Sequence, residues 1–286
     1  MLFDTGMHEP GSLAHLERAL DQVNLRLEHV RLIVCTHAHS DHYGQAATIQ
    51  QAADCELWMH PNHAHMTEAA QDPDAALERR IEVARQSGIP EEPLRRYAEQ
   101  RKGQGFGIAE LVEPDRDLLP GVTIGTDLGE WTVHETPGHA PSHICLFQRE
   151  RRLLISGDHV LGRISLYYDY GWTPDPVGEF LHSLDVVDEL DARLALSGHG
   201  RPFVDVHGHI EGNRELVRER VDAVLAALPG GPRTAVQISP SVYGEPLTQY
   251  NTSWLLSQTL CYLRHLELAG RVRHEPDGEV EVWHLV

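Results

Sequence analysis

A run of six residues in the first quarter of the chain, HAHSDH at positions 37–42, combines three imidazoles with a carboxylate. Residues 31–35 before it, RLIVC, are typical of a short buried strand. Because alternate residues of an extended segment point the same way, His37 and His39 can bind one metal ion together. Asp41 and His42 follow as the backbone turns toward a helix, and they can face a second ion. Zinc accepts both kinds of ligand, so the run predicts part of a two-ion site.

Neither half of this run completes a coordination shell, so further ligands must come from other parts of the chain. His139 in TPGH, Asp158 in SGDH and His199 in SGHG each follow a predicted strand and lie in a glycine-bearing turn. Such turns, held on a rigid scaffold, commonly carry functional side chains. We predict that Asp158 bridges two ions, which are held by two sets of ligands: His37, His39 and His139, and Asp41, His42 and His199.

A pair of ions held in this way predicts hydrolysis. Two ions about 3.5–4 Å apart share a bridging water and lower its pKa until hydroxide forms near pH 7. The metal-bridging hydroxide attacks a carbonyl or phosphoryl centre, and the ion held by three histidines polarises the scissile oxygen. Asp41 is placed to relay the proton, so we predict it to be the catalytic residue. The expected cofactor is two Zn2+, with iron or manganese as alternatives.

The other histidines, from a total of 20, are expected to have mainly structural roles. His60, His63 and His65 follow a predicted strand, and we expect them to cap a helix and to pack. His143 and His159 flank ligand positions and are expected to support the ligands. Four tyrosines beside the motifs can either point a phenol at the substrate carbonyl or form an aromatic wall: Tyr43, Tyr167, Tyr168 and Tyr170.

The ligand turns depend on an alternation of helices and strands that indicates an α/β fold. Ser12 can cap a helix with leucines at helical spacing, and strands are expected over 31–35 and 55–59. From 60 to 117 the chain is helical and strongly charged, which predicts an insert that forms a lid over the site. Strand patterns return after residue 118, and helices are expected over 176–190 and 210–228.

The run PGGP at 229–232 is the clearest domain boundary in the sequence. Beyond it we expect a helix over 252–269 and two alternating strands around Asp277-Gly278, a hairpin pattern. These elements predict a small winged-helix-like module over 229–286, after a catalytic domain over 1–228. The module is not notably basic, so we expect it to have a structural, dimer-forming or substrate-cleft role.

Five motifs in order resemble the metallo-β-lactamase superfamily: DTG at 4–6, HAHSDH, TPGH, the GD turn at 157–158 and the GHG turn at 198–200. The resemblance covers about residues 1–228, and it implies a four-layer αββα sandwich with the metals at one edge of two facing sheets. With Asp41 rather than Glu, the motif is more similar to the zinc-type hydrolases than to the diiron oxygen-reducing branch. Family members carry several strands before the DTG turn, so N-terminal strands are missing here and we expect the natural chain to start upstream of Met1.

The same motifs are similar to those of hydroxyacylglutathione hydrolases, acyl-homoserine-lactone lactonases and thioesterases. The tail is similar to that of the lactamase-beta-like group. We therefore expect a dinuclear metal-dependent hydrolase of a small ester, thioester or lactone, whose partner is a small-molecule acyl substrate. Three alternatives stay open: a phosphodiesterase or endoribonuclease of the lactamase-beta-like type, a mononuclear-iron persulfide dioxygenase, and a metal-binding module without catalysis.

Composition narrows these alternatives. The formal net charge is −19, from 43 acidic and 24 basic residues, which disfavours nucleic-acid partners because phosphate backbones bind positive surfaces. No run is long and apolar enough to span a bilayer, and the start MLFDTGMHEP lacks a signal-peptide pattern, so we expect a cytoplasmic protein without membrane contact. Four cysteines without a CxxC pattern predict reduced thiols, and a homodimer is left open.

Overall fold

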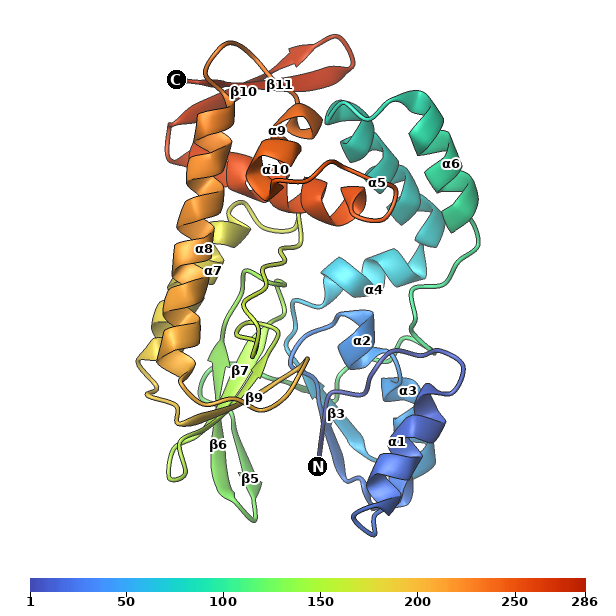
Figure 1. The fold of residues 1–286 in the computed structure, drawn as a ribbon. Helices are drawn as coiled ribbons and strands as arrows, with labels where there is room; N and C mark the ends of the chain where they lie inside the picture. Colours follow the sequence, from blue (N-terminus) through green and yellow to red (C-terminus); the bar gives the residue numbers. More distant parts are fainter.

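Two β-sheets face each other in the computed structural model, which describes residues 1–286 (Figure 1). The first sheet is parallel and has four strands in chain order: β1 (Leu2–Phe3), β2 (Leu32–Val34), β3 (Glu56–Met59) and β4 (Arg116–Asp117). The second sheet has five strands: β5 (Thr123–Thr126), β6 (Gly129–Glu135), β7 (Ile144–Gln148), β8 (Leu153–Gly157) and β9 (Leu194–Ser197). The pairs β5–β6, β6–β7 and β7–β8 are antiparallel, and β9 runs parallel to β8.

The side chains of each strand alternate between two hydrophobic clusters, and this alternation produces the layers. In β2, Val34 packs between the two sheets, whereas Ile33 packs on the outer face against α1 (Ser12–Asp21) and α3 (Ala46–Ala53). In β7, Leu146 packs between the sheets, whereas Phe147 faces α7 (Pro176–Asp188) and α8 (Val206–Ala227). The order of layers is helix, sheet, sheet, helix, and it confirms the predicted αββα sandwich.

Between β3 and β4 the chain is helical, as predicted for the insert. It forms α4 (Ala64–Gln71), α5 (Pro73–Gln86) and α6 (Glu91–Arg101). Two residues favour the start of helix α5. The Asp72 carboxylate caps the helix by accepting a hydrogen bond from the Ala75 amide at 3.0 Å, and Pro73 occupies the first helical position. These helices extend beyond the sheets toward the C-terminal part of the chain (Figure 1).

The C-terminal part contains α9 (Ala235–Tyr243), α10 (Thr252–Leu268) and a hairpin of β10 (Val272–Asp277) and β11 (Val280–Leu285). The predicted helix and hairpin are therefore both present. Leu260 of α10 and Trp283 of β11 belong to the same hydrophobic cluster as Phe147 of β7 and Val224 of α8. Residues 229–286 thus share their core with the sandwich, and the winged-helix-like module remains a prediction.

The remaining short elements are η1 (Leu27–His29) and α2 (Ser40–Tyr43). All four cysteines are free thiols, as predicted. None of the helices combines the length and the apolar character that a membrane crossing requires.

Candidate metal centre

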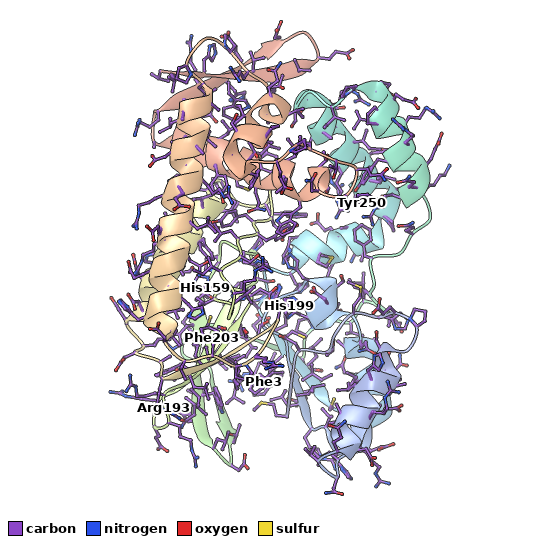
Figure 2. All side chains as sticks on the ribbon, viewed as in Figure 1. Phe3, His159, Arg193, His199, Phe203 and Tyr250 are labelled. Atoms are coloured by element: carbon purple, nitrogen blue, oxygen red, sulfur yellow. The ribbon has the colours of Figure 1, made fainter.

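The ligand-bearing turns meet because each begins where a strand ends. The run 37–42 follows β2, and the turns that carry His139, Asp158 and His199 follow β6, β8 and β9. His199 leaves the end of β9 near the middle of the molecule (Figure 2). All seven predicted ligands fall into groups whose ligand atoms lie within 4.8 Å of one another. The structure therefore brings together side chains that are up to 162 positions apart, from 37 to 199.

The first set is three imidazoles around one point. His37 Nε2 lies 3.0 Å from His39 Nδ1, and His139 Nε2 lies 3.1 Å from the same atom. A tetrahedral zinc with Zn–N bonds of about 2.0–2.1 Å holds its ligand nitrogens roughly 3.3 Å apart. Both distances to His39 Nδ1 are therefore close to that spacing, and all three nitrogens lie within 4.8 Å of one another.

The second set lies beside the first and shares a carboxylate with it. His199 Nε2 is 3.1 Å from Asp41 Oδ2 and 3.2 Å from Asp158 Oδ2. His42 Nε2 is 3.5 Å from Asp158 Oδ1 and 3.8 Å from Asp41 Oδ2. Asp158 Oδ2 is also 3.8 Å from His139 Nε2 of the first set. Asp158 thus lies between the two sets, where a bridging ligand is needed.

Two buried polar atoms of these sets show whether a cation fits between them. His42 Nε2 and Asp158 Oδ1 are buried without a hydrogen-bond partner, although they face each other. A buried polar atom without a partner costs about 1–3 kcal/mol. A divalent cation between these atoms would satisfy both, and the set contains only nitrogen and oxygen donors. The residues present therefore fit divalent metal ions.

The two sets differ in protonation. Burial, followed by the charges of neighbouring groups such as His39, lowers the pKa of His139 to about 3, so this imidazole is neutral and ready to bind. Burial also lowers the pKa of His42, but the neighbouring carboxylates of Asp158 and Asp4 outweigh it and raise this pKa to about 10. Hydrogen bonds to Asp158 and Asp41 likewise raise the pKa of His199 to about 10. Without metal, the imidazoles of His42 and His199 are therefore positively charged at pH 7.

Asp4, in the DTG turn, fixes the orientation of His42. Its Oδ2 accepts a hydrogen bond from His42 Nδ1 at 2.9 Å, and its Oδ1 accepts one from the Thr36 amide at 2.7 Å. A carboxylate on the far nitrogen of a metal-binding histidine sets the tautomer and raises the basicity of the ligand. The sequence singled out DTG as a motif but gave it no role, and the structure supplies one.

A second carboxylate, Asp169, supports His39. Asp169 Oδ2 accepts a hydrogen bond from His39 Nε2 at 2.9 Å and lies 2.9 Å from His65 Nδ1. His65 Nε2 is 2.8 Å from Ser142 Oγ, which accepts a hydrogen bond from the Ala38 amide at 3.0 Å. His65 thus belongs to the support of the ligand loop, whereas the sequence predicted only capping and packing for it. Ser142 lies in the turn that follows TPGH, but no supporting role was predicted for it or for Asp169.

The other histidines singled out in the sequence lie outside the two sets. His143 supports Asp158, because its Nε2 accepts a hydrogen bond from the Asp158 amide at 3.0 Å. His159 is buried against Phe180, with ring centroids 4.8 Å apart. The last two bind neighbouring polar side chains: His60 binds Glu135 and His63 binds Thr67.

Of the four tyrosines, Tyr167 lies at the centre and Tyr170 lines the cavity beside it. The ring of Tyr167 lies 5.8 Å from that of His39 and 5.6 Å from that of His139. Tyr43 is fully buried, and its hydroxyl donates a hydrogen bond to the Val112 carbonyl at 2.8 Å, because on helix α2 it points away from the ligands. Tyr168 follows Tyr167 but points the opposite way, into the core. These two side chains are therefore not available to a substrate.

Two glycines of the motifs are required by close packing. A Cβ on Gly198 would collide with Asp158 Oδ1 and His42 Cε1. Gly138 has a φ of +122°, and a Cβ there would lie 2.5 Å from the backbone of Phe180. Glycine before His199 and before His139 therefore lets the ligand turns approach their neighbours.

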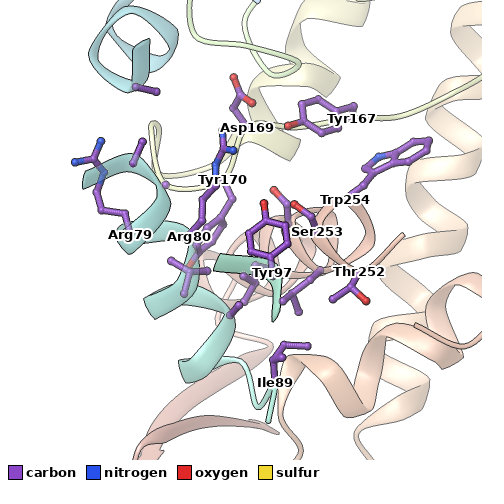
Figure 3. A pocket seen from close by; sticks show the side chains of 18 of the residues that line it. Arg79, Arg80, Ile89, Tyr97, Tyr167, Asp169, Tyr170, Thr252, Ser253 and Trp254 are labelled. Atoms are coloured by element: carbon purple, nitrogen blue, oxygen red, sulfur yellow. The ribbon is translucent and has the colours of Figure 1, made fainter. Parts of the chain in front are cut away.

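A cavity of about 1510 Å³ opens from the metal centre. Five of the ligands line it: His39, Asp41, His139, Asp158 and His199. From there it extends under the helical insert to α10, and Figure 3 shows part of its lining. The ligand sets therefore lie at the wall of a space that can hold a substrate.

Comparison with known families and relatives agrees with this geometry. The sequence model of the family described as "Metallo-beta-lactamase superfamily" matches residues 1–199. The probable metallo-hydrolase YqjP of Bacillus subtilis is 26% identical over 257 residues, which cover 86% of this chain and 79% of that protein. An atrochrysone carboxyl ACP thioesterase of Aspergillus chevalieri is 26% identical over 191 residues, 61% of this chain and 58% of the thioesterase.

Two solved structures match almost the whole chain, including its C-terminal part. A metallo-beta-lactamase family protein from Thermus thermophilus is 25% identical with a TM-score of 0.82, and the match covers 99% of this chain and 89% of that one. A beta-lactamase domain protein from Burkholderia ambifaria is also 25% identical with a TM-score of 0.82, over 99% of this chain and 81% of that one.

Proposed function

This chain belongs to the metallo-beta-lactamase superfamily of metal-dependent hydrolases, and we propose that it uses two metal ions to hydrolyse an ester, thioester or lactone of small-molecule size. The observation that carries this proposal is the shared carboxylate. Asp158 Oδ2 is 3.2 Å from His199 Nε2 in one ligand set and 3.8 Å from His139 Nε2 in the other. One group within reach of both sets is what a centre with two ions needs.

Two bound divalent ions would supply a water of lowered pKa and a Lewis acid for the scissile oxygen. We assign the first ion to His37, His39 and His139, and the second to Asp41, His42 and His199, with Asp158 between them. Nitrogen and oxygen donors without a cysteine suit Zn2+, and iron and manganese accept the same ligands.

Asp41 is the residue that we assign to proton transfer. It lines the cavity and is less buried than Asp158, with side-chain exposures of 38% and 9%. Burial raises the pKa of Asp41, but the hydrogen bond from His199 and the charge of His42 outweigh it and lower this pKa. The carboxylate is therefore ionised at neutral pH and can accept a proton from the attacking water.

Two observations favour an acyl substrate over a nucleic acid. The net charge of −19 opposes the approach of a phosphate backbone. Among the relatives is a protein whose name describes a thioesterase, although this chain spans 58% of its length. An acyl carbonyl in the cavity would lie beside the ligand sets and Tyr167.

A hydrolysis screen combined with metal counting tests the proposal. Purified protein would be offered thioesters, esters, lactones, phosphodiesters and RNA, before and after removal of metal by a chelator. We expect hydrolysis of an acyl substrate that is lost with the metal and restored by Zn2+. Cleavage of RNA or phosphodiesters alone, or oxygen consumption with one iron per chain, would contradict the proposal.

A further inference from the structure

The cavity has two ends of different chemistry. At one end are metal ligands and Tyr167, and at the other are apolar side chains from four helices. In Figure 3, Asp169 and Tyr167 lie at one end, Tyr97 and Ser253 lie between, and Ile89 lies at the opposite end. A substrate whose carbonyl is held at the metal end would therefore extend its acyl part toward the apolar end.

The apolar end is built from buried side chains that leave space unfilled. Leu94 of α6, Leu256 of α10 and Leu260 of α10 all line the cavity, yet they are only 4%, 4% and 2% exposed. Three arginines of α5 and α6 also line the cavity, and each is exposed to solvent: Arg79, Arg80 and Arg96. An apolar group placed among the leucines would leave water without meeting a buried charge.

The wall of the apolar end is held in place by contacts between the helical insert and the C-terminal helices. Val83 and Ile89 of the insert pack against the hydrophobic cluster that contains α10. The Ser87 carbonyl accepts a hydrogen bond from the Val236 amide of α9 at 3.1 Å. Gly88, with a φ of +96°, allows the insert to pass close to Thr234. The insert and the C-terminal helices, far apart in the sequence, therefore form one prebuilt wall.

The size of the cavity indicates the size of its ligand. Ligand pockets for drug-sized molecules are on the order of 300–1,000 Å³. This cavity is about 1510 Å³, so an acetyl or lactyl group at the metal end would leave most of it empty. Filling it with an acyl chain would bury apolar surface at each added methylene.

We propose that this cavity is an acyl-binding pocket and that the substrate is a thioester or ester of a bulky, apolar carboxylic acid. This inference rests on the proposed acyl hydrolase function and names its substrate class. The carbonyl would lie beside Tyr167 and the ligand sets, and the acyl tail would lie between α5 and α6 on one side and α10 on the other. The insert and the C-terminal part together would thus determine specificity.

A series of N-acetylcysteamine thioesters with acetyl, butyryl, hexanoyl, octanoyl and decanoyl chains tests the inference on the full-length, metal-loaded protein. Each buried methylene stabilises the complex by about 0.8 kcal/mol, so kcat/KM is expected to rise up to about 4-fold per methylene until the pocket is full. Ser253→Trp, which fills part of the cavity from α10, is expected to lower the ratio of kcat/KM for the decanoyl thioester to kcat/KM for the acetyl thioester at least about 10-fold.

Two further variants complete the test. Ser241→Trp makes the same change at an exposed position of α9 outside the cavity, and it is expected to keep the wild-type profile. Tyr97→Ala enlarges the cavity and is expected to shift the preferred chain to a longer one. The inference would be overturned if kcat/KM of the wild-type protein did not depend on chain length, or if Ser253→Trp and Ser241→Trp gave the same dependence. In either case, metal-dependent hydrolysis of the acetyl thioester would still support the proposed function. Failure to hydrolyse every chain length would overturn both.

Discussion

His42 uses its two ring nitrogens for different tasks. Nδ1 donates a hydrogen bond to Asp4, whereas Nε2 faces Asp158 without a hydrogen-bond partner. Because the first contact sets the tautomer, it decides whether Nε2 has a lone pair to offer a metal ion.

Asp4→Asn is therefore expected to weaken metal binding. The amide keeps the shape of the side chain but removes the charge that holds the proton on Nδ1, and losses of about 10–100-fold in metal affinity or activity are typical of such changes. Competition with a chromophoric chelator measures the affinity. Asp127→Asn, at an exposed turn, is the matched control, and equal affinities for the two variants would contradict the role of Asp4.

His65 is expected to matter for activity, although the sequence predicted only capping and packing for it. In His65→Ala, the Asp169 carboxylate loses one of its two imidazole neighbours, and Ser142 loses its contact with the His65 ring. The ring of His39 is then held less firmly, and kcat/KM is expected to fall about 10-fold or more with the fold intact. The control is His63→Ala. His63 lies two positions away, and its ring contacts only Thr67 and Glu113. Equal activity of the two variants would show that His65 only packs.

The protonation of His42 and His199 predicts the pH dependence of metal binding. Both imidazoles have a pKa of about 10 without metal, so both are in the doubly protonated, positively charged form at pH 7. Metal ions bind neutral imidazole, so binding must release these protons, and the affinity should fall as the pH is lowered below 10. Calorimetry of Zn2+ binding at pH 7 in two buffers of different ionisation enthalpy measures the release. Identical heats in the two buffers would be inconsistent with it.

At the scale of elements, helix α7 joins the sandwich to the C-terminal part through Asp175, the residue that caps its N-terminus. The Asp175 carboxylate accepts a hydrogen bond from the Gly178 amide at 2.9 Å and one from His265 Nδ1 of α10 at 3.0 Å. The same side chain thus caps one helix and binds another.

Asp175→Ala is expected to lower the free energy of unfolding by about 1–2 kcal/mol, because it removes the cap and the contact with α10 together. Urea titration of metal-free protein measures this without a contribution from metal release. Asp205→Ala removes the corresponding cap of α8, where the Gly208 amide is 3.2 Å away and no second helix is bound. A loss no larger for Asp175→Ala than for Asp205→Ala would argue against the link to α10.

Elements that carry the ligands were predictable because each strand has a buried pattern that ends at a turn with its own motif. The strand over 31–35 and the turns at 138, 157 and 198 are of this kind. Helix α8 begins at Val206, earlier than the predicted 210, because Asp205 caps it. Asp169 and His65 could not be predicted, since they lie in an irregular segment and in the insert, and only packing brings them to His39.

At the scale of the whole molecule, one hydrophobic cluster joins β7, α8, α10 and β11. The sequence placed a domain boundary at 229–232 because proline and glycine break local structure there. A local break in secondary structure does not indicate whether the hydrophobic cores on either side of it are separate. The shared hydrophobic cluster could therefore not be predicted from these residues. The same sharing lets the C-terminal helices reach the cavity beside the metal centre.

Convergence of four distant turns on two metal ions is the central claim, and metal counting tests it most directly. Mass spectrometry of purified protein loaded with Zn2+ should give two ions per chain, and Asp158→Ala should lose metal together with activity because both sets use this carboxylate. A single ion in the wild-type chain, or full zinc content in Asp158→Ala, would contradict the account.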